Sequence, residues 1–430
     1  MTGLPPATVR RISICEKICF VFDAQPRHFR SLKFAESFAM TRWTLDTIHA
    51  ALPAIEQELA RTAAERDRAG GHAAEQKELL RQNGLLLLVV PQEYGGIGAS
   101  WSDTLAIVRR IARVDSAMAH LLAFQTLQLS GVLSYGSDEQ RALYLRETVA
   151  LNHWWGNSAN PADPRLIATE QDGGLILQGI KGFCSGTLGS HRLLTTALHQ
   201  PSGKILIAVL PTAREGITIH DDWDPIGQRQ TDSTSVSYEQ VRLEWSEVLF
   251  RPDGVSTPFL SLRGVVAQLI LVNLYLGMAE GAFEQARDYT LNQGRPWFAA
   301  GVQRAADDPY VIHRYAEMHL QIRAARALAD EAGAELDKVW RIGPALVAEQ
   351  RGRAALAVAE AKVLAHRTAL AVGQDVFDVC GARATKATLG LDRFWRNART
   401  HTLHDPIDYK LRDVGRYALE HLLPEPTLYS

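Results

Sequence analysis

The chain has 430 residues, of which 46% are hydrophobic and 22% are charged, and its formal net charge is −2 at pH 7. This balance is ordinary for a globular protein and excludes a disordered or collagen-like chain. It offers no basic stripe for nucleic acid, and no unbroken apolar run reaches the roughly 18–20 residues of a membrane span. The four cysteines are scattered, so we expect no disulfide framework and a cytoplasmic location.

The first 39 residues are basic and irregular. Their apolar stretch, residues 18–22, is too short for the hydrophobic region of a secretory signal. A helical pattern begins only after Met40. We therefore expect residues 1–39 to be a disordered extension and Met40 to be the working start of the protein.

Residues 40–153 predict an N-terminal helical domain. Apolar residues recur at helical spacing from Thr44, a predicted N-cap, to Arg66. A second helix is expected to stop at Gly84, where the conformational freedom of glycine favours a break. This second helix spans 77–83, and three further helices are predicted at 102–114, 117–133 and 139–150.

The pattern changes near Trp154. From 154 to 262, short alternating runs separated by turn residues predict a β domain, a small barrel or sandwich between two helical blocks. The pair Gly173-Gly174 indicates a hairpin turn. The predicted strands span 175–179, 193–197, 205–210 and 235–238.

Helical periodicity returns after Arg263, so residues 263–430 predict a C-terminal helical bundle. The segments 264–292, 310–340 and 344–372 predict helices about 42–47 Å long at 1.5 Å per residue, a length that fits an antiparallel bundle. No Gly-x-Gly-x-x-Gly follows a strand, so no nicotinamide-binding unit is expected. No His/Cys cluster has metal-ligand spacing, so no metal site is expected either.

Three motifs in this order resemble the acyl-CoA dehydrogenase fold. Residues 91–96 (Pro-Gln-Glu-Tyr-Gly-Gly) resemble an early loop of that family, and 179–186 (Gly-Ile-Lys-Gly-Phe-Cys-Ser-Gly) resemble its flavin-facing strand. Residues 392–399 resemble its arginine-bearing helix. The resemblance implies a mainly α protein with an N-terminal helical domain, a middle β-barrel domain and a C-terminal four-helix bundle.

The most specific motif is 394–406, Phe-Trp-Arg-Asn-Ala-Arg-Thr-His-Thr-Leu-His-Asp-Pro. With 154–157 (Trp-Trp-Gly-Asn) and 295–297 (Arg-Pro-Trp), it resembles dibenzothiophene monooxygenases and related sulfur-acquisition oxidoreductases, which are two-component flavin monooxygenases. The resemblance covers roughly residue 45 to the C-terminus. It implies reduced FMN, with FAD as the alternative that the parent fold uses. It also implies a separate flavin reductase, which supplies the flavin by diffusion, and a homotetramer.

The same resemblance places His404 where many acyl-CoA dehydrogenases carry the glutamate that removes the substrate's α-proton. A histidine could abstract a proton, but the expected carboxylate is lost, and Asp405 would point elsewhere if it followed on a helix. Oxygenation requires instead that a flavin C4a-hydroperoxide stay protonated and dry. We expect His404 to control that protonation. The alternative is a helix-terminal histidine bonded to a backbone carbonyl.

Four more residues are placed in the pocket by the resemblance. The hydroxyl of Ser185 could bond the flavin or the peroxide, and the amide of Asn157 could fix either one. His120 lies on the helix that lines the pocket, although a satisfied core histidine is an equal alternative. Phe124 stands where the sulfur-oxygenating relatives have a tyrosine. The lost hydroxyl puts dibenzothiophene itself in doubt as the substrate.

Two arginines, Arg295 and Arg383, match family positions that hold the flavin phosphate. Arginine suits bidentate phosphate binding, and in this fold such contacts can cross a subunit boundary, which implies an oligomer. The alternative for each is a surface salt bridge. Cys184 is expected to be a small buried residue, because no activating base is adjacent in the sequence.

Together these features predict a monooxygenase that uses reduced FMN and O2 to oxygenate a neutral, fairly apolar organosulfur or similar heteroatom-containing compound. Two alternatives stay open. An acyl-CoA dehydrogenase with a displaced base would bleach its flavin with an acyl-CoA in the absence of O2. A catalytically inactive scaffold would bind flavin without turnover.

Overall fold

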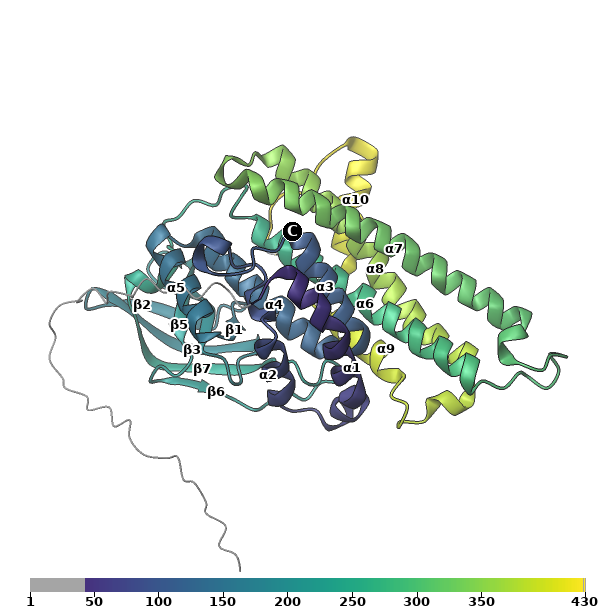
Figure 1. The fold of residues 1–430 in the computed structure, drawn as a ribbon. Helices are drawn as coiled ribbons and strands as arrows, with labels where there is room; N and C mark the ends of the chain where they lie inside the picture. The colour runs from purple at the N-terminus through teal and green to yellow at the C-terminus, as the bar shows by residue number, and fades with distance from the viewer. Residues whose placement is uncertain (1–42, 428, 430) are drawn as a thin grey trace, which may run out of the picture. The chain divides into compact units, whose positions relative to one another are not determined.

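The computed structural model describes residues 43–427 and residue 429. The expectations for residues 1–39 and for Met40 lie outside this part of the chain. Within it, helices α1–α5 come first, strands β1–β8 follow, and helices α6–α10 complete the chain, with short 3-10 turns between them (Figure 1).

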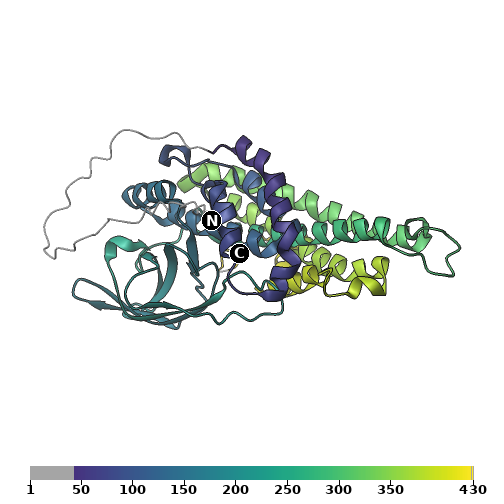
Figure 2. The ribbon, with the colours of Figure 1, turned by 60° about the horizontal axis from the view of Figure 1, so that its bottom comes forward.

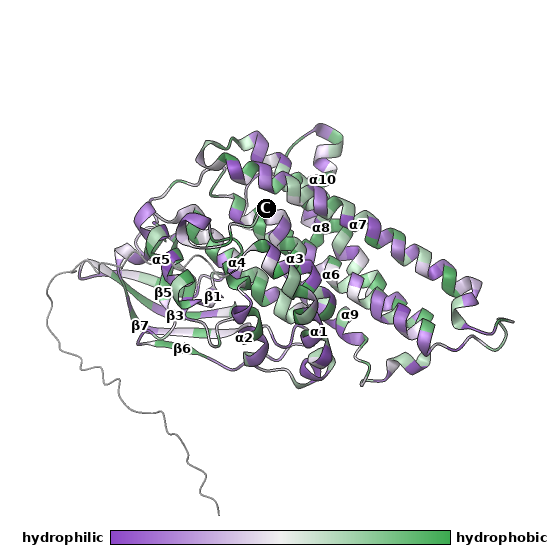
Figure 3. Ribbon diagram, viewed as in Figure 1, coloured by the Kyte–Doolittle hydropathy of each residue, from purple (hydrophilic) through white to green (hydrophobic). Residues whose placement is uncertain are grey.

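The first helices follow the predicted periodicity. Helix α1 (Leu45–Ala69) begins after Thr44, whose hydroxyl accepts the backbone N–H of Thr47, so the predicted N-cap is confirmed. The other four helices are α2 (Ala74–Gln82), α3 (Trp101–Val114), α4 (Ser116–Tyr135) and α5 (Asp138–Leu151). Figure 3 shows both green and purple residues on α3, which buries one apolar face, whereas α4 is buried along almost its whole length.

The β domain is one eight-stranded sheet with the order β6-β7-β3-β2-β4-β5-β8, and β1 also pairs with β4. The strands are β1 (Trp155–Ser158), β2 (Leu166–Gln171), β3 (Gly174–Cys184), β4 (Arg192–His199), β5 (Lys204–Pro211), β6 (Ile217–Ile219), β7 (Thr234–Leu243) and β8 (Val248–Phe250). The four predicted strands correspond to β3, β4, β5 and β7. The predicted hairpin is confirmed, because Gln171 pairs with Gly174 across the turn. The sheet curves around its own apolar core (Figure 2).

The C-terminal bundle is built on three long helices: α6 (Leu262–Asn292), α7 (Pro309–Ile342) and α8 (Ala348–Cys380). Helix α8 packs against both α6 and α7, α9 (Asp392–His401) lies against α6 and α8, and α10 (Ile407–Glu420) packs on α8. Helix α8 extends past the predicted end at 372, because buried residues continue along it to Val379 and Cys380.

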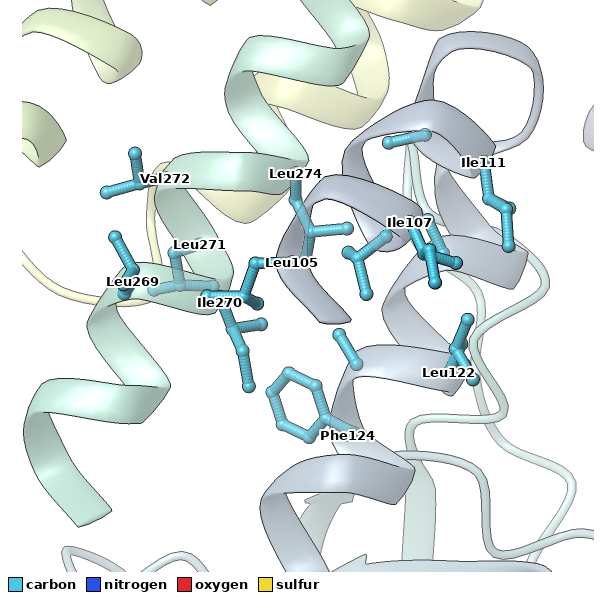
Figure 4. Close-up of a cluster of buried hydrophobic side chains, with 14 of the residues drawn as sticks. Leu105, Ile107, Ile111, Leu122, Phe124, Leu269, Ile270, Leu271, Val272 and Leu274 are labelled. Atoms are coloured by element: carbon cyan, nitrogen blue, oxygen red, sulfur yellow. The ribbon is translucent and has the colours of Figure 1, made fainter. Parts of the chain in front are cut away.

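Helix α6 is the centre of the bundle. It is long and apolar enough to cross a membrane, but 83% of its most apolar 18-residue window is buried inside the protein, as in the core helix of a bundle. Figure 4 shows Ile270 of α6 facing Phe124 of α4, whereas Leu269 and Val272 point away from it. The contact between α4 and α6 therefore fixes one wall of the cavity described next.

Candidate active site

A cavity of about 1030 Å³ is lined by α4, α6, several strands and the segment that follows α9. Pockets for small molecules commonly measure about 300–1,000 Å³, so this one has room for a cofactor and a substrate together. Five residues predicted to form the site line the cavity: His120, Phe124, Asn157, Ser185 and His404. The structure thus brings together side chains that come from opposite ends of the sequence.

A pair of buried histidines lies at one end of the cavity. His120 Nδ1 on α4 is 2.8 Å from His401 Nε2 at the end of α9, so one of the two nitrogens donates to the other. The ring of Phe124 stacks on His120 with 4.1 Å between ring centroids. Burial lowers the pKa of His120 to about 3 and holds the pKa of His401 well below its usual value. Both imidazoles are therefore neutral near pH 7.

Each imidazole of this pair keeps one buried nitrogen, Nε2 of His120 and Nδ1 of His401, without a partner in the described part of the chain. Buried polar atoms are normally bonded, so two orphans at a cavity wall fit a bound polar ligand. His401 is a residue that the sequence prediction misses as a site residue. The available signal is its spacing, His401-x-x-His404, within the most specific motif.

His404 lies in the turn after α9, and its side chain is 38% exposed. Its Nδ1 is 3.0 Å from Asp405 Oδ1, and its ring meets that of Tyr429 edge-on at 5.7 Å. An Nδ1–H that donates to a carboxylate fixes the tautomer of the ring and leaves Nε2 free for a ligand. His404 is therefore an oriented imidazole at the cavity wall.

The carboxylate of Asp405, which contacts His404, is bound by a lysine from the core of the bundle. Lys362 Nζ on α8 lies 2.6 and 2.7 Å from the two oxygens of Asp405, and it also donates to Gln268. Burial opposes ionisation of Asp405, but the hydrogen bond from His404 and the charge of Lys362 hold its pKa well below its usual range. Asp405 does not line the cavity; it lies in the turn after α9 and not on a helix, and its carboxylate contacts the ring of His404.

Hydroxyl and amide groups line the wall formed by the β domain. Ser185 Oγ is 2.8 Å from Ser233 Oγ, which is 2.8 Å from Thr231 Oγ1. The backbone N–H of Asn157 donates to the Ser185 carbonyl, so the two residues are fixed to each other. Cys184 is buried, and burial raises the pKa of its thiol to about 12, in agreement with the prediction that it is no nucleophile.

No aspartate or glutamate is among the described residues that line the cavity. Removal of an α-proton from a thioester needs a base within hydrogen-bonding reach. The ionisable side chains at this wall are instead histidines, one arginine and tyrosines. The cavity therefore lacks the carboxylate on which an acyl-CoA dehydrogenase depends.

Arg295 and Arg383 lie away from this cavity. Both are exposed, one in the loop that follows α6 and the other in the turn that follows α8. Those helix ends are neighbours, since Thr290 and Cys380 are in contact. The structure thus places both arginines at the same end of the bundle and brings neither to the cavity of its own chain.

Comparison with known proteins shows the family to which the chain belongs. Models of the acyl-CoA dehydrogenase N-terminal and C-terminal domains match residues 48–151 and 269–409. A probable FMNH2-dependent monooxygenase, SfnC of Pseudomonas putida, is 46% identical over 382 residues, which are 88% of this chain and 97% of that protein. A dibenzothiophene monooxygenase of Rhodococcus qingshengii is 43% identical over 385 residues, 86% of this chain and 92% of that one.

Two solved structures resemble the whole described fold. Methanesulfinate monooxygenase MsuC of Pseudomonas fluorescens has a TM-score of 0.87 and 46% identity, covering 90% of this chain and 99% of its own. FMN-bound TdsC of Paenibacillus sp. A11-2 has a TM-score of 0.85 and 37% identity, covering 90% and 100%. The fold is therefore that of the acyl-CoA dehydrogenases, as the sequence motifs predict. Within that fold, the chain belongs to the family of flavin-dependent monooxygenases.

Proposed function

We propose that this protein is the oxygenase component of a two-component system, which uses reduced FMN and O2 to oxygenate a small organosulfur compound. The observation that carries the proposal is the cavity wall, where His404 presents an imidazole oriented by Asp405 and the described lining residues include no carboxylate that could act as a base. The names of the relatives support reduced FMN as the flavin. A separate reductase supplies it, because no nicotinamide-binding motif is visible in the sequence.

The residues present fit a flavin. Ser185 and Asn157 offer a hydroxyl and an amide on the wall formed by the β domain, and His120 and His401, each with one unpartnered buried nitrogen in the described chain, line the helical wall. Bound reduced FMN supplies the two electrons and the position at which O2 is activated. Phe124 and the other apolar residues of the lining keep water away from that position.

His404 is the catalytic residue that holds and moves a proton. Its Nε2 can donate to, or accept from, a group in the cavity while Asp405 keeps the ring in place. Lys362 keeps Asp405 ionised, so the orientation of His404 is set from the core of the bundle. The neutral pair His120–His401 adds hydrogen bonds without adding charge.

The two exposed arginines complete the proposal. Arg295 and Arg383 of one subunit hold the flavin phosphate at the cavity of a neighbouring subunit, in a homotetramer. Their exposure at one shared end of the bundle supports this role, since neither reaches the cavity of its own chain. We further propose that the enzyme works in the cytoplasm, where its buried free thiols, Cys184 and Cys380, stay reduced.

A single-turnover experiment tests the proposed function. The protein is mixed anaerobically with reduced FMN and an organosulfur compound, and air-saturated buffer is then added. The proposal predicts one oxygenated product per flavin oxidised, with little free hydrogen peroxide. Complete conversion of the oxidised flavin equivalents into hydrogen peroxide would show that the protein only binds flavin. Bleaching of oxidised flavin by an acyl-CoA without O2 would show a dehydrogenase instead.

A further inference from the structure

One wall of the cavity carries a cation that has no anionic partner. Arg263 is the second residue of α6 and lines the cavity. Its Nη2 donates to the side-chain oxygen of Gln128 at 3.2 Å, and its Nε is shielded from solvent without any partner in the described chain. A guanidinium stays charged at neutral pH even where burial lowers its pKa. A shielded charge that has only a neutral acceptor is unfavourable unless an anion joins it.

Three other buried cations of the described chain have more hydrogen-bond acceptors than Arg263. Lys362 lies between the two oxygens of Asp405, and Lys77 is 3.3 Å from a carboxylate oxygen of Asp232. Lys181 donates to two backbone carbonyls at 2.5 and 2.6 Å. Each of these three lysines has two or more acceptors, whereas Arg263 has one, so its guanidinium keeps donors for a ligand.

The surroundings of Arg263 favour an anion. It is the single lysine or arginine among the described lining residues, and those residues include no carboxylate. The side-chain nitrogen of Gln128, whose oxygen accepts from Arg263, is buried without a partner in the described chain, although Gln128 itself does not line the cavity. Gly131 lies beside the guanidinium, since a Cβ there would be 3.4 Å from Arg263 Nε, so Arg263 packs against α4.

The arginine lies toward the other end of the cavity from the histidines. Gln128, its hydrogen-bond partner, follows His120 by eight residues on α4, or about 12 Å along the helix axis. Phe124 lies between them on the same helix and lines the cavity. Arg263 therefore borders the same cavity as His120, His401 and Phe124.

We propose that Arg263 binds an oxyanion of the substrate, and that the substrate is an anionic organosulfur compound, of which an alkanesulfinate is the simplest. This inference rests on the proposed function and narrows its substrate class. It differs from the neutral substrate that the sequence predicts. It also separates two relatives, because methanesulfinate is an anion at neutral pH and dibenzothiophene is a neutral aromatic compound.

The chemistry of a sulfinate balances within the proposed reaction. Its sulfur carries a lone pair, which forms the new S–O bond and gives a sulfonate. The second atom of O2 leaves as water, with both hydrogens and both electrons from reduced FMN, which becomes oxidised FMN. Arg263 takes no part in the electron transfer; it neutralises the charge of the substrate and holds its oxygen atoms, as guanidinium groups do.

Binding of an unreactive anion tests the inference without turnover. Methanesulfonate is titrated into the full-length protein by isothermal calorimetry, in the absence of flavin. We expect saturable binding that Arg263→Met weakens about 10- to 100-fold, the ratio that corresponds to the 1.5–3 kcal/mol typical of a hydrogen bond to a charged group. Arg353→Met, which removes an exposed arginine paired with Glu349, should bind like the wild type. Equal affinity in the wild type and Arg263→Met, or no binding to the wild type, would overturn the proposal.

A second titration separates the substrate from the flavin phosphate, the other anion that this enzyme binds. Quenching of FMN fluorescence should give a dissociation constant for Arg263→Met within about threefold of the wild-type value. A loss of FMN affinity with unchanged methanesulfonate binding would assign Arg263 to the flavin phosphate and overturn the proposal. If Arg263→Met does not fold by circular dichroism, Arg263→Lys replaces it, and this variant should retain saturable anion binding with reduced affinity; a lysine variant without binding in a folded protein contradicts a role based on charge.

The two proposals fail in different ways. If methanesulfonate binds through Arg263 but no organosulfur compound is oxygenated, the anion site stands and the proposed function is wrong. If a neutral sulfide is oxygenated and the anion does not bind, the function stands and the inference about Arg263 is wrong.

Discussion

The buried ionisable side chains at the two ends of the cavity differ in their charge. At one end, burial lowers the pKa of His120 to about 3 and that of His401 well below its usual value, so both rings give up their charge. At the other end, Arg263 keeps its charge, because a guanidinium does not lose its proton near neutral pH. Its one hydrogen-bond acceptor in the described chain is the neutral amide of Gln128.

This difference assigns separate tasks to the two ends. Neutral imidazoles can donate and accept hydrogen bonds beside a reacting group without attracting counter-ions or water. An unpaired guanidinium attracts an anion and orients it. We therefore assign control of the proton to the histidines, with His404, and recognition of the charge of the substrate to Arg263. The predictions below test whether the two ends can be changed independently, from the largest expected effect to the smallest.

The largest effect is expected for His404→Ala. Positioned acid–base groups contribute about 10²–10⁴-fold to rates, so product formation should fall by at least about 100-fold. The fold should be retained, because the His404 side chain is 38% exposed and packs on little of the core. Product per oxidised flavin is the measurement. His313→Ala, which changes an exposed histidine on α7, is the matched control and should keep wild-type coupling.

Lys362→Met should destabilise the protein and disturb the orientation of His404. Loss of one partner leaves Asp405 as an uncompensated buried charge, which costs about 3–5 kcal/mol. Urea unfolding measures this loss. Lys338→Met, on the surface of α7, should change the free energy of unfolding by less than about 0.5 kcal/mol.

The double variant Lys362→Met/Asp405→Asn sharpens this test. It removes both charges, so it should be more stable than Lys362→Met alone. If the double variant is instead less stable by the sum of the two single losses, the pair does not interact as described. Anion binding by Arg263 should persist in every folded member of this set, since the two ends act independently.

Stability should fall with acidity because of the histidine end. The pKa of His120 is lowered from the unfolded value near 6.5 to about 3, so its contribution is complete above pH 6.5 and is lost as the pH falls toward 3. Each such histidine lowers the free energy of unfolding by up to about 1.4 kcal/mol per pH unit in that range. Urea unfolding between pH 8 and pH 5 should therefore show a smaller slope for His401→Gln than for the wild type, whereas His313→Gln should leave the slope unchanged.

Phe124→Tyr should have the smallest effect. The added hydroxyl lies at the cavity wall, where a single neutral hydrogen bond is worth about 0.5–1.5 kcal/mol, so kcat/KM should change by no more than about tenfold. Steady-state kinetics with an alkanesulfinate and with a neutral aromatic sulfide measure the change. A shift of more than 100-fold toward the neutral sulfide would mean that Phe124, and not Arg263, sets the substrate class.

Sequence reasoning predicts the fold best where apolar periodicity is long. Helices α6, α7 and α8 follow from the spacing of their apolar residues, whereas β1 and β6 are missed because three or four residues show no period. Strand β2 begins with apolar residues and ends with Thr169, Glu170 and Gln171, so its second half lacks the alternation of a half-buried strand.

The site is predictable only in part, for a related reason. A specific motif locates His404, and the resemblance locates Ser185 and Asn157 at the same wall. The partners that give the site its properties come from distant segments: His120 and His401 are 281 positions apart, and Lys362 and Asp405 are 43 apart. In the sequence, Arg263 is one charged residue at the start of a helix, and only the packing of α6 on α4 turns it toward the cavity.

The most direct measurement of the central claim is the fate of isotopic oxygen. The protein, reduced FMN and methanesulfinate are mixed under ¹⁸O₂, and the product is analysed by mass spectrometry. Transfer from O2 predicts methanesulfonate that carries one ¹⁸O atom, with FMN oxidised in equal amount. Methanesulfonate that carries oxygen from water alone would contradict transfer from O2, and unchanged methanesulfinate beside fully oxidised flavin would contradict the claim that the protein oxygenates a sulfinate.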